Sequence, residues 1–236
     1  MKSLKGNIEN IYMVLHRIIL LTFIDTIFPH ELIVYILWKY YGTFNQIKFS
    51  GNGNHSLCLK DGVVYSTGKN HCYQLGTIDD DDRCHFVKLD IKDVVNVANG
   101  IQHSIVQKKD GSLYGFGSNS FGQLGCTGIL SPGEIRKLPI TDVLSLTCGN
   151  FYSIVQTKIG LFSTGNNDHG CLGLDNTITT TEFTQINIDN VISFRSSLWT
   201  VFILTKDGLF AQGNNRHGQL GVGDTCLLYT SDAADE

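Results

Sequence analysis

The nine residues GSNSFGQLG, Gly117 to Gly125, contain three glycines and no charged side chain. Closely similar strings occur three more times, as GKNHCYQLG from Gly68, GNNDHGCLG from Gly165 and GNNRHGQLG from Gly213. The first glycines of these four loops are separated by 49, 48 and 48 residues. Self-similarity at such a fixed period is typical of repeat architectures, and we therefore expect about four repeats over residues 47–225.

Two further markers recur in step with this loop. One reads HSLCLKDGVVYSTG from His55, HSIVQKKDGSLYGFG from His103, YSIVQTKIGLFSTG from Tyr152 and TVFILTKDGLFAQG from Thr200. The other reads VVNVANG up to Gly100 and VLSLTCG up to Gly149, and it becomes VISFRSS in the fourth unit. The three markers keep the same order throughout, so each unit is one structural module.

The sequence between the markers favours short antiparallel strands. Ser104–Gln107 and Ser112–Phe116 are runs of mainly apolar and aromatic residues, as strands require. Between them, Lys-Asp-Gly predicts a tight turn, because Asp110 tolerates a left-handed conformation and Gly111 favours it. Val143–Cys148 is a further predicted strand, and it leads into the next unit.

Several short strands per period, with no helical pattern between them, predict blades of antiparallel sheet that stack around an axis. The expected fold is all-β, a partial β-propeller of about four blades. The glycine loop then recurs because each blade needs one such corner, and Asn119 and Gln123 are expected to hydrogen-bond its exposed backbone. The repeat positions that we expect to serve the fold are His55, Gly68, Gly76, Gly100, His103, Gly117, Gly125, Gly149, Gly165, Gly173, Gly213 and Gly221.

The combined pattern G-x-x-H-S, D-G and G-x-N-x-x-G-Q-L-G resembles the regulator of chromosome condensation repeat, from Gly51 to Thr225. The resemblance implies a seven-bladed propeller, of which about four units are present here. The fourth unit is expected to stop before its final strand, with the remaining blades encoded beyond this sequence. The departures from the pattern are Tyr152 and Thr200 for histidine, Ile159 for aspartate, Tyr73 for a loop glycine and Cys171 for glutamine. Of these, Ile159 weakens the turn signal of the third hairpin.

The last eleven residues, 226–236, read CLLYTSDAADE and resemble the translation of a transposase-based sequencing adapter. We expect them not to be natural protein. The whole chain of 236 residues has a net charge of −4. Without this tail, which holds three acidic residues and no basic one, 19 acidic residues face 18 basic ones. Charge therefore predicts attraction neither to nucleic acid nor to a membrane.

The six cysteines outside this tail are scattered and form no C-x-x-C pair. They favour free thiols in a reducing compartment, so we expect an intracellular protein of the cytoplasm or nucleus. The pairs His71-Cys72 and Cys84-His85 match no standard zinc spacing. We expect no metal and no cofactor.

Two groups of residues are candidate chemical sites. His55 and His103 each precede a serine, but adjacent strand residues point to opposite faces, so a structural role is expected and no catalytic residue is predicted. The acidic run Asp79, Asp80, Asp81, Asp82 lacks the spacing of a calcium loop. It is either a solvated loop or a contact for a basic partner.

The N-terminal residues 1–46 do not follow the repeat. The apolar stretch 11–28 contains His16, Arg17 and Asp25, which disfavour a membrane span, and no signal-peptide cleavage motif follows it. The segment FPHELIVYILWKYYG predicts a helix that begins at Pro29.

This predicted helix has two interpretations. It is a cap that packs its apolar face on the propeller, or it resembles the start of an F-box, which binds a Skp-type adaptor of a ubiquitin ligase. The residues that carry the second interpretation are Pro29, Glu31, Leu32, Ile33, Ile36 and Leu37.

The leading functional hypothesis is a protein-protein interaction module, with substrate recognition in ubiquitination as its finer form. The alternative is a guanine-nucleotide exchange factor for a Ran-type small GTPase, as the family resemblance implies. A ligase domain in a C-terminal continuation is a third possibility of the same resemblance.

Overall fold

The computed structural model describes residues 47–223 and, for the backbone alone, residues 228–233. These residues form four sheets, each of four antiparallel strands in chain order. The first sheet contains β1 (Lys48–Ser50), β2 (His55–Lys60), β3 (Val63–Gly68) and β4 (Arg83–Lys88). The second contains β5 (Val94–Asn99), β6 (His103–Lys108), β7 (Leu113–Gly117) and β8 (Arg136–Lys137).

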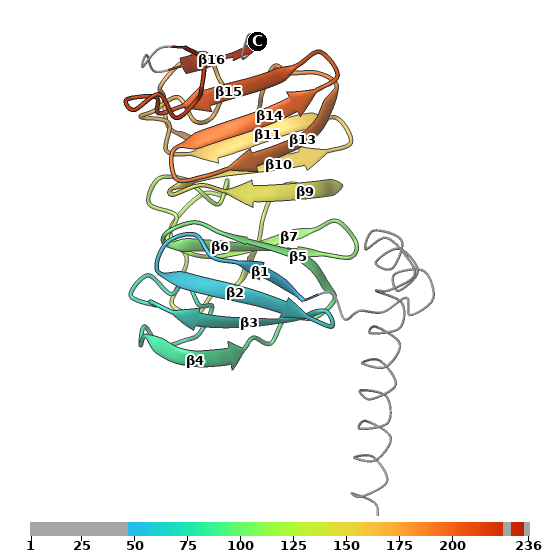
Figure 1. Cartoon of the computed structure of the whole chain (residues 1–236). Helices are drawn as coiled ribbons and strands as arrows, with labels where there is room; N and C mark the ends of the chain where they lie inside the picture. The colour runs from blue at the N-terminus through green and yellow to red at the C-terminus, as the bar shows by residue number, and fades with distance from the viewer. Residues whose placement is uncertain (1–46, 224–227, 234–236) are drawn as a thin grey trace, which may run out of the picture. The chain divides into compact units, whose positions relative to one another are not determined.

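The remaining two sheets repeat this arrangement. The third contains β9 (Val143–Cys148), β10 (Tyr152–Thr157), β11 (Gly160–Gly165) and β12 (Thr180–Gln185). The fourth contains β13 (Val191–Ser196), β14 (Thr200–Thr205), β15 (Leu209–Gly213) and β16 (Leu228–Ala233). Figure 1 shows the sheets stacked one on the next in chain order. The described part of the chain is therefore a partial β-propeller, one sheet per repeat, as the sequence predicts.

The repeat markers locate three of the four strands in the second, third and fourth sheets, and they locate β2 and β3 in the first sheet. The predicted strands Ser104–Gln107, Ser112–Phe116 and Val143–Cys148 correspond to β6, β7 and β9 within two residues. The fourth strands lie in the variable segments and were not predicted. Because an outer strand pairs with its neighbour through backbone groups, its side chains need no shared pattern.

The fourth sheet differs from the sequence-based expectation. The fourth unit was expected to end before its last strand, but β16 pairs with β15, with Phe210 opposite Ala233 and Gly213 opposite Leu228. The N–H and C=O groups along the outer edge of β15 can pair with any extended segment, so this pairing does not require the natural sequence of the repeat. The adapter origin of residues 226–236 stays a prediction.

The hairpin turns follow the Lys-Asp-Gly signal with one correction. In the first sheet Asp61 and Gly62 both have positive φ, of 54° and 77°. In the second sheet only Gly111 has a positive φ, so Asp110 does not adopt the left-handed conformation that it tolerates. Its carboxylate instead accepts hydrogen bonds from the backbone N–H and the hydroxyl of Ser112. The third hairpin forms despite Ile159, with Thr157 paired to Gly160.

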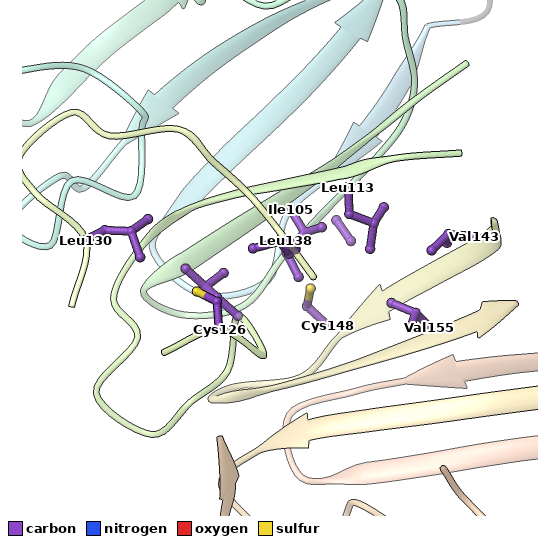
Figure 2. Packing of buried hydrophobic residues seen from close by; sticks show 10 residues of the cluster. Ile105, Leu113, Cys126, Leu130, Leu138, Val143, Cys148 and Val155 are labelled. Atoms are coloured by element: carbon purple, nitrogen blue, oxygen red, sulfur yellow. The ribbon is translucent and has the colours of Figure 1, made fainter. Parts of the chain in front are cut away.

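Apolar side chains fill the space between successive sheets, which we call the first, second and third seams. The second seam contains Ile105 and Leu113 from the second sheet, Val143 and Val155 from the third, and Leu138 from the segment that links them. Figure 2 shows these side chains converging between the two sheets. Each fully buried aliphatic side chain stabilises the fold by about 1.5–3 kcal/mol, so the seams carry most of the stability.

The glycine loops begin where the backbone of one strand approaches the neighbouring strand. Gly117 ends β7 with φ +94°, and a Cβ on it would lie only 2.5 Å from the carbonyl oxygen of Gln102. Gly128, in the following loop, has φ +78° but has open space around its Cβ position. A left-handed backbone costs an L-residue roughly 1–2 kcal/mol, and the contact at Gly117 adds to that cost.

We expect Gly117→Ala to lower the free energy of unfolding by at least 2 kcal/mol more than Gly128→Ala, on the order of a severe point mutation. The reason is that only the first substitution forces a methyl group against main-chain atoms. Chemical denaturation of the two variants of the whole chain measures the difference. Equal losses would show that the loop start tolerates a side chain.

Candidate functional site

The loops lie at the two ends of the strands. The glycine loops and the segments between the first and second strands of each sheet lie at one end, which we call the glycine-loop end; it is on the left in Figure 1. The turns between the second and third strands, and the segments that join one sheet to the next, lie at the other end, the hairpin end.

The first strands of all four sheets line a cleft of about 590 Å³. Its walls are mainly polar, with Asn96 and Asn99 from β5 and Ser145 and Thr147 from β9. Hydrogen bonds join neighbouring strands along this wall, including one of 2.6 Å from Ser50 Oγ to Asn99 Oδ1. Arg195 is the one formally charged residue that lines the cleft. This wall corresponds to the axis of the propeller.

The repeat histidines hold one sheet to the next. His55 Nε2 lies 2.8 Å from Ser104 Oγ in the second sheet, and Ser104 Oγ donates to the carbonyl of Gln74, 2.8 Å away. The second seam has the same arrangement, with His103 Nε2 at 3.0 Å from Ser153 Oγ. Each histidine therefore pairs with the serine of the next repeat, not with the serine beside it in the sequence.

This geometry is structural. The serine hydroxyl has one proton and gives it to a carbonyl, so the histidine Nε2 must carry the proton that joins the two side chains. Burial lowers the pKa of His55 from 6.5 to about 4 and that of His103 to about 3. Both histidines are therefore neutral at physiological pH. A serine fixed by a neutral donor inside a buried seam is not an activated nucleophile.

At two of the seams, a glycine three residues before the ring makes room for it. A Cβ on Gly100 would collide with the imidazole of His103, and one on Gly149 would collide with the phenol ring of Tyr152. In the fourth unit Ser197 stands at this position, where Thr200 replaces the ring. The degraded marker VISFRSS is thus explained by the smaller residue that follows it.

The third seam uses other donors for the same purpose. Val201 occupies the serine position of the fourth sheet and has no hydroxyl. The longer Tyr152 reaches past it, and its hydroxyl lies 2.8 Å from the carbonyl oxygen of Ser197. The amide of Gln212 donates to the carbonyl of Cys171 at 2.9 Å, which replaces the missing serine bond. The departures at this seam compensate one another.

The amide side chains of the glycine loop hydrogen-bond its backbone as predicted, but the side chains of Asn119 and Gln123 are buried. Asn119 Oδ1 accepts from the N–H of Leu124 at 2.9 Å, and Gln123 Oε1 accepts from the N–H of Phe121 at 2.9 Å. Asn70, Asn167 and Asn215 make the bond equivalent to that of Asn119. Asn119 is only 8% exposed and Gln123 is fully buried, so the loop is an internal staple.

The acidic run lies at the glycine-loop end with two of its four carboxylates engaged in strong contacts. Asp79 Oδ1 lies 2.6 Å from Arg83 Nη2. Asp82 Oδ1 accepts from the N–H of Asn70 at 2.8 Å, so it belongs to the loop staple. Asp81 Oδ2 lies 3.8 Å from Arg83 Nη1, and all four aspartates are exposed. The contact of this run with a basic partner stays a proposal.

The cysteines of the described residues are free, with Cys126, Cys148 and Cys171 buried. Burial raises the pKa of the Cys148 and Cys171 thiols to about 12, so they are protonated and unreactive. Within residues 47–223, no three His, Cys, Asp or Glu side chains gather in a group that could hold a metal ion.

A row of rings at the glycine-loop end was not predicted from the sequence. The ring centroids of Phe121 and Phe151 lie 5.2 Å apart, and those of Phe151 and Trp199 lie 5.8 Å apart. His169 stands edge-on to Trp199 at 4.8 Å. We call these four residues the aromatic row. Phe121 and His169 occupy the same position of successive glycine loops, which is the signal that an alignment of the units would have given.

The predicted N-terminal helix, with Pro29, Glu31, Leu32, Ile33, Ile36 and Leu37, lies outside the described residues, as does the apolar stretch 11–28. Among the residues that are described, no helix has the length and apolar character needed to cross a membrane.

Comparisons with known proteins agree with the repeat pattern. Residues 94–123 and residues 110–156 match two models of the regulator of chromosome condensation (RCC1) repeat. Human WBSCR16 is 25% identical with a TM-score of 0.72, over 82% of this chain and 54% of that protein. Yeast RCC1 (Prp20), in complex with Kap60, is 20% identical with a TM-score of 0.71, over 82% of this chain and 50% of Prp20.

The chain thus spans about half the length of the solved structures that it resembles. A search of curated proteins by sequence gives no match.

We expect Ser153→Ala to lower the free energy of unfolding by about 1–3 kcal/mol, because it leaves the Nε2–H of His103 and the carbonyl of Gln123 without a partner in a buried seam. Ser56→Ala is the matched control. Ser56 holds the same repeat position in β2, and its side chain makes no hydrogen bond within the described residues. Its loss should stay below about 0.5 kcal/mol. A similar loss in both variants would contradict the role of the serine across the seam.

Lowering the pH should destabilise the fold through the buried histidines. Their folded-state pKa values lie below 6.5, so the unfolded chain takes up protons first and stability is lost as pH falls below about 6.5. Between pH 7 and pH 5 the loss is roughly 2 kcal/mol per histidine. Urea denaturation at both pH values should show that the free energy of unfolding of His103→Gln falls by about half as much as that of the unsubstituted chain. An unchanged loss in that variant would contradict the assignment.

Proposed function

We propose that this chain of regulator of chromosome condensation repeats is a protein-interaction module that holds another protein at the glycine-loop end of its propeller. The support comes from a contrast within the four repeats. Positions inside the seams are the same from unit to unit, or they change in coupled sets, as at Tyr152 and Gln212. The side chains at these positions pack and hydrogen-bond within the fold, so they are not available to a partner.

The observation that carries the proposal is that the exposed positions above the seams follow no such rule. The pairs across the three seams are Gln102 with His71, Phe151 with Phe121, and Trp199 with His169. At the first seam the amide Gln102 stands where the other two seams have Phe151 and Trp199, so stacking of the sheets does not require an aromatic ring at that position. Aromatic side chains kept partly in solvent are typical of protein-binding surfaces.

The finer form of the proposal is a substrate-recognition adaptor in ubiquitination. It rests on the F-box-like run from Pro29 to Leu37, which directly precedes the repeats. In this form the N-terminal segment binds a Skp-type adaptor, and the glycine-loop end holds the protein to be modified. The protein would then act in the cytoplasm or nucleus.

The second candidate is guanine-nucleotide exchange on a Ran-type GTPase. It is favoured by the shared fold with yeast Prp20p, whose structure is described together with its binding to Gsp1p and histones. At 20% identity that likeness concerns the fold, so exchange activity here is a hypothesis. It needs no covalent catalytic group, since one end of the propeller would deform the nucleotide site of the GTPase.

The test places a photo-crosslinking amino acid at Phe121 or, as the control, at Ile159. Phe121 is exposed at the glycine-loop end, and Ile159 is exposed at the hairpin end of the third sheet. In living cells the Phe121 position should yield one discrete protein adduct that disappears in a Trp199→Leu background. Adducts from Ile159 alone, or equal adducts from both positions, would refute the proposal.

The same crosslinking variants distinguish the adaptor from the exchange factor. For the adaptor, the paired substitution Leu32→Asp and Ile36→Asp removes co-purification of a Skp-type adaptor and leaves the Phe121 adduct in place. For exchange, the adduct is a Ran-type GTPase, and the whole chain accelerates its nucleotide release.

A further inference from the structure

The aromatic row extends over parts of three sheets. Phe121 follows β7 in the second sheet, His169 follows β11 in the third, and Phe151 and Trp199 precede β10 and β14. Phe121 is 40% exposed, and the other three rings are partly exposed. Leu198, beside Trp199, is 52% exposed. The row is therefore a line of partly exposed rings that crosses the second and third seams.

Stacking between sheets does not account for the choice of rings. At the first seam Gln102 stands at the position of Phe151 and Trp199, and its Nε2 lies 3.2 Å from Nε2 of His71; the loop position of Phe121 and His169 is Cys72 there. An amide in place of a ring thus suffices at this end of that seam. The rings at the other two seams leave apolar surface in contact with water, which has a free-energy cost unless a ligand covers it.

The charge around the row indicates the chemistry of that ligand. Counting loops and strand ends, the described part of the glycine-loop end carries seven acidic residues and four basic ones. The hairpin end carries seven acidic and nine basic residues, so the two ends differ in sign. Asp168, next to His169 in the row, is exposed. Four of the seven acidic residues are Asp79–Asp82 of the first sheet, and Asp168 is the carboxylate next to the row. Partly exposed rings at an end with an excess of carboxylates attract cations, because the face of each ring is electron-rich.

We infer that the aromatic row binds an extended, arginine-bearing segment of the partner protein, with the guanidinium groups stacked on the rings. This inference rests on the proposed function and specifies the partner's chemistry. Arginine fits better than lysine, because its planar group stacks on aromatic faces and is weakly hydrated. Side chains at positions i and i+2 of an extended segment lie about 7 Å apart, which is close to the 5.2 and 5.8 Å steps along the row.

The test uses labelled peptides of alternating threonine and X, where X is arginine, lysine, glutamate or asparagine. The protein is the whole chain with Trp38→Phe, which leaves Trp199 as its one tryptophan. Fluorescence anisotropy of the peptide measures affinity, and the emission of Trp199 reports contact with the row. We expect the arginine peptide to bind most tightly, to bind less tightly as salt is raised, and to change the emission of Trp199.

Three variants locate the site. Trp199→Leu and Phe151→Leu keep apolar bulk but remove a π face, so each should weaken binding of the arginine peptide roughly 3- to 30-fold. Ile159→Leu at the hairpin end is the matched control and should leave the affinity unchanged. Thermal unfolding of each variant confirms that the seams remain intact.

The outcomes separate this inference from the proposed function. If the glutamate or asparagine peptide binds best and Trp199→Leu weakens it, the glycine-loop end is an interaction surface and the arginine inference fails. If no peptide binds although Phe121 yields its adduct in cells, the inference also fails alone. If adducts arise only from Ile159, the proposed function fails, and the arginine inference, which depends on it, fails as well.

Discussion

Each four-stranded sheet of this protein has two faces to remove from water, and only a neighbouring sheet can cover them. That requirement makes every repeat depend on the next one. The second seam shows the consequence, since Ile105 and Leu113 from one sheet meet Val143 and Val155 from the following sheet in a single buried cluster. The glycines and polar side chains of the repeat serve this packing, because they let backbones approach closely and satisfy the groups that burial isolates.

The third seam shows how the stacked sheets tolerate substitutions at the repeat positions. A single replacement in a buried hydrogen-bond set leaves a partner unsatisfied, which is costly. A set of replacements that restores the bonds avoids that cost. Val201 removes a hydroxyl, Gln212 supplies a donor to the carbonyl that lost it, and Tyr152 binds main-chain carbonyls beyond the valine. Departures from a repeat pattern are therefore best interpreted in pairs across a seam and not one unit at a time.

The sequence was sufficient for the architecture, for three strands of each of the last three sheets and for two strands of the first, because these features depend on local patterns that recur. It was insufficient for contacts between repeats. The bond from His55 to Ser104 spans 49 residues, so no local pattern reveals it. The fourth strands were missed because backbone pairing leaves their side chains free. A weaker local signal was available and unused: Asp93, Asp142 and Asn190, each just before the first strand of a sheet, share a left-handed conformation.

The same reasoning explains why the site could not be predicted from the sequence. A recognition surface on a repeat frame consists of the positions that the frame leaves free, and these have no motif. They can be recognised only after the residues that packing and hydrogen bonding between the sheets require have been identified and set aside. In this protein that leaves the aromatic row, whose rings come from both sides of two seams. A partner that stacks on rings from two sheets contacts both sides of a seam at once. Its binding free energy therefore adds to the interactions that hold the sheets together, so recognition and stability share one set of contacts.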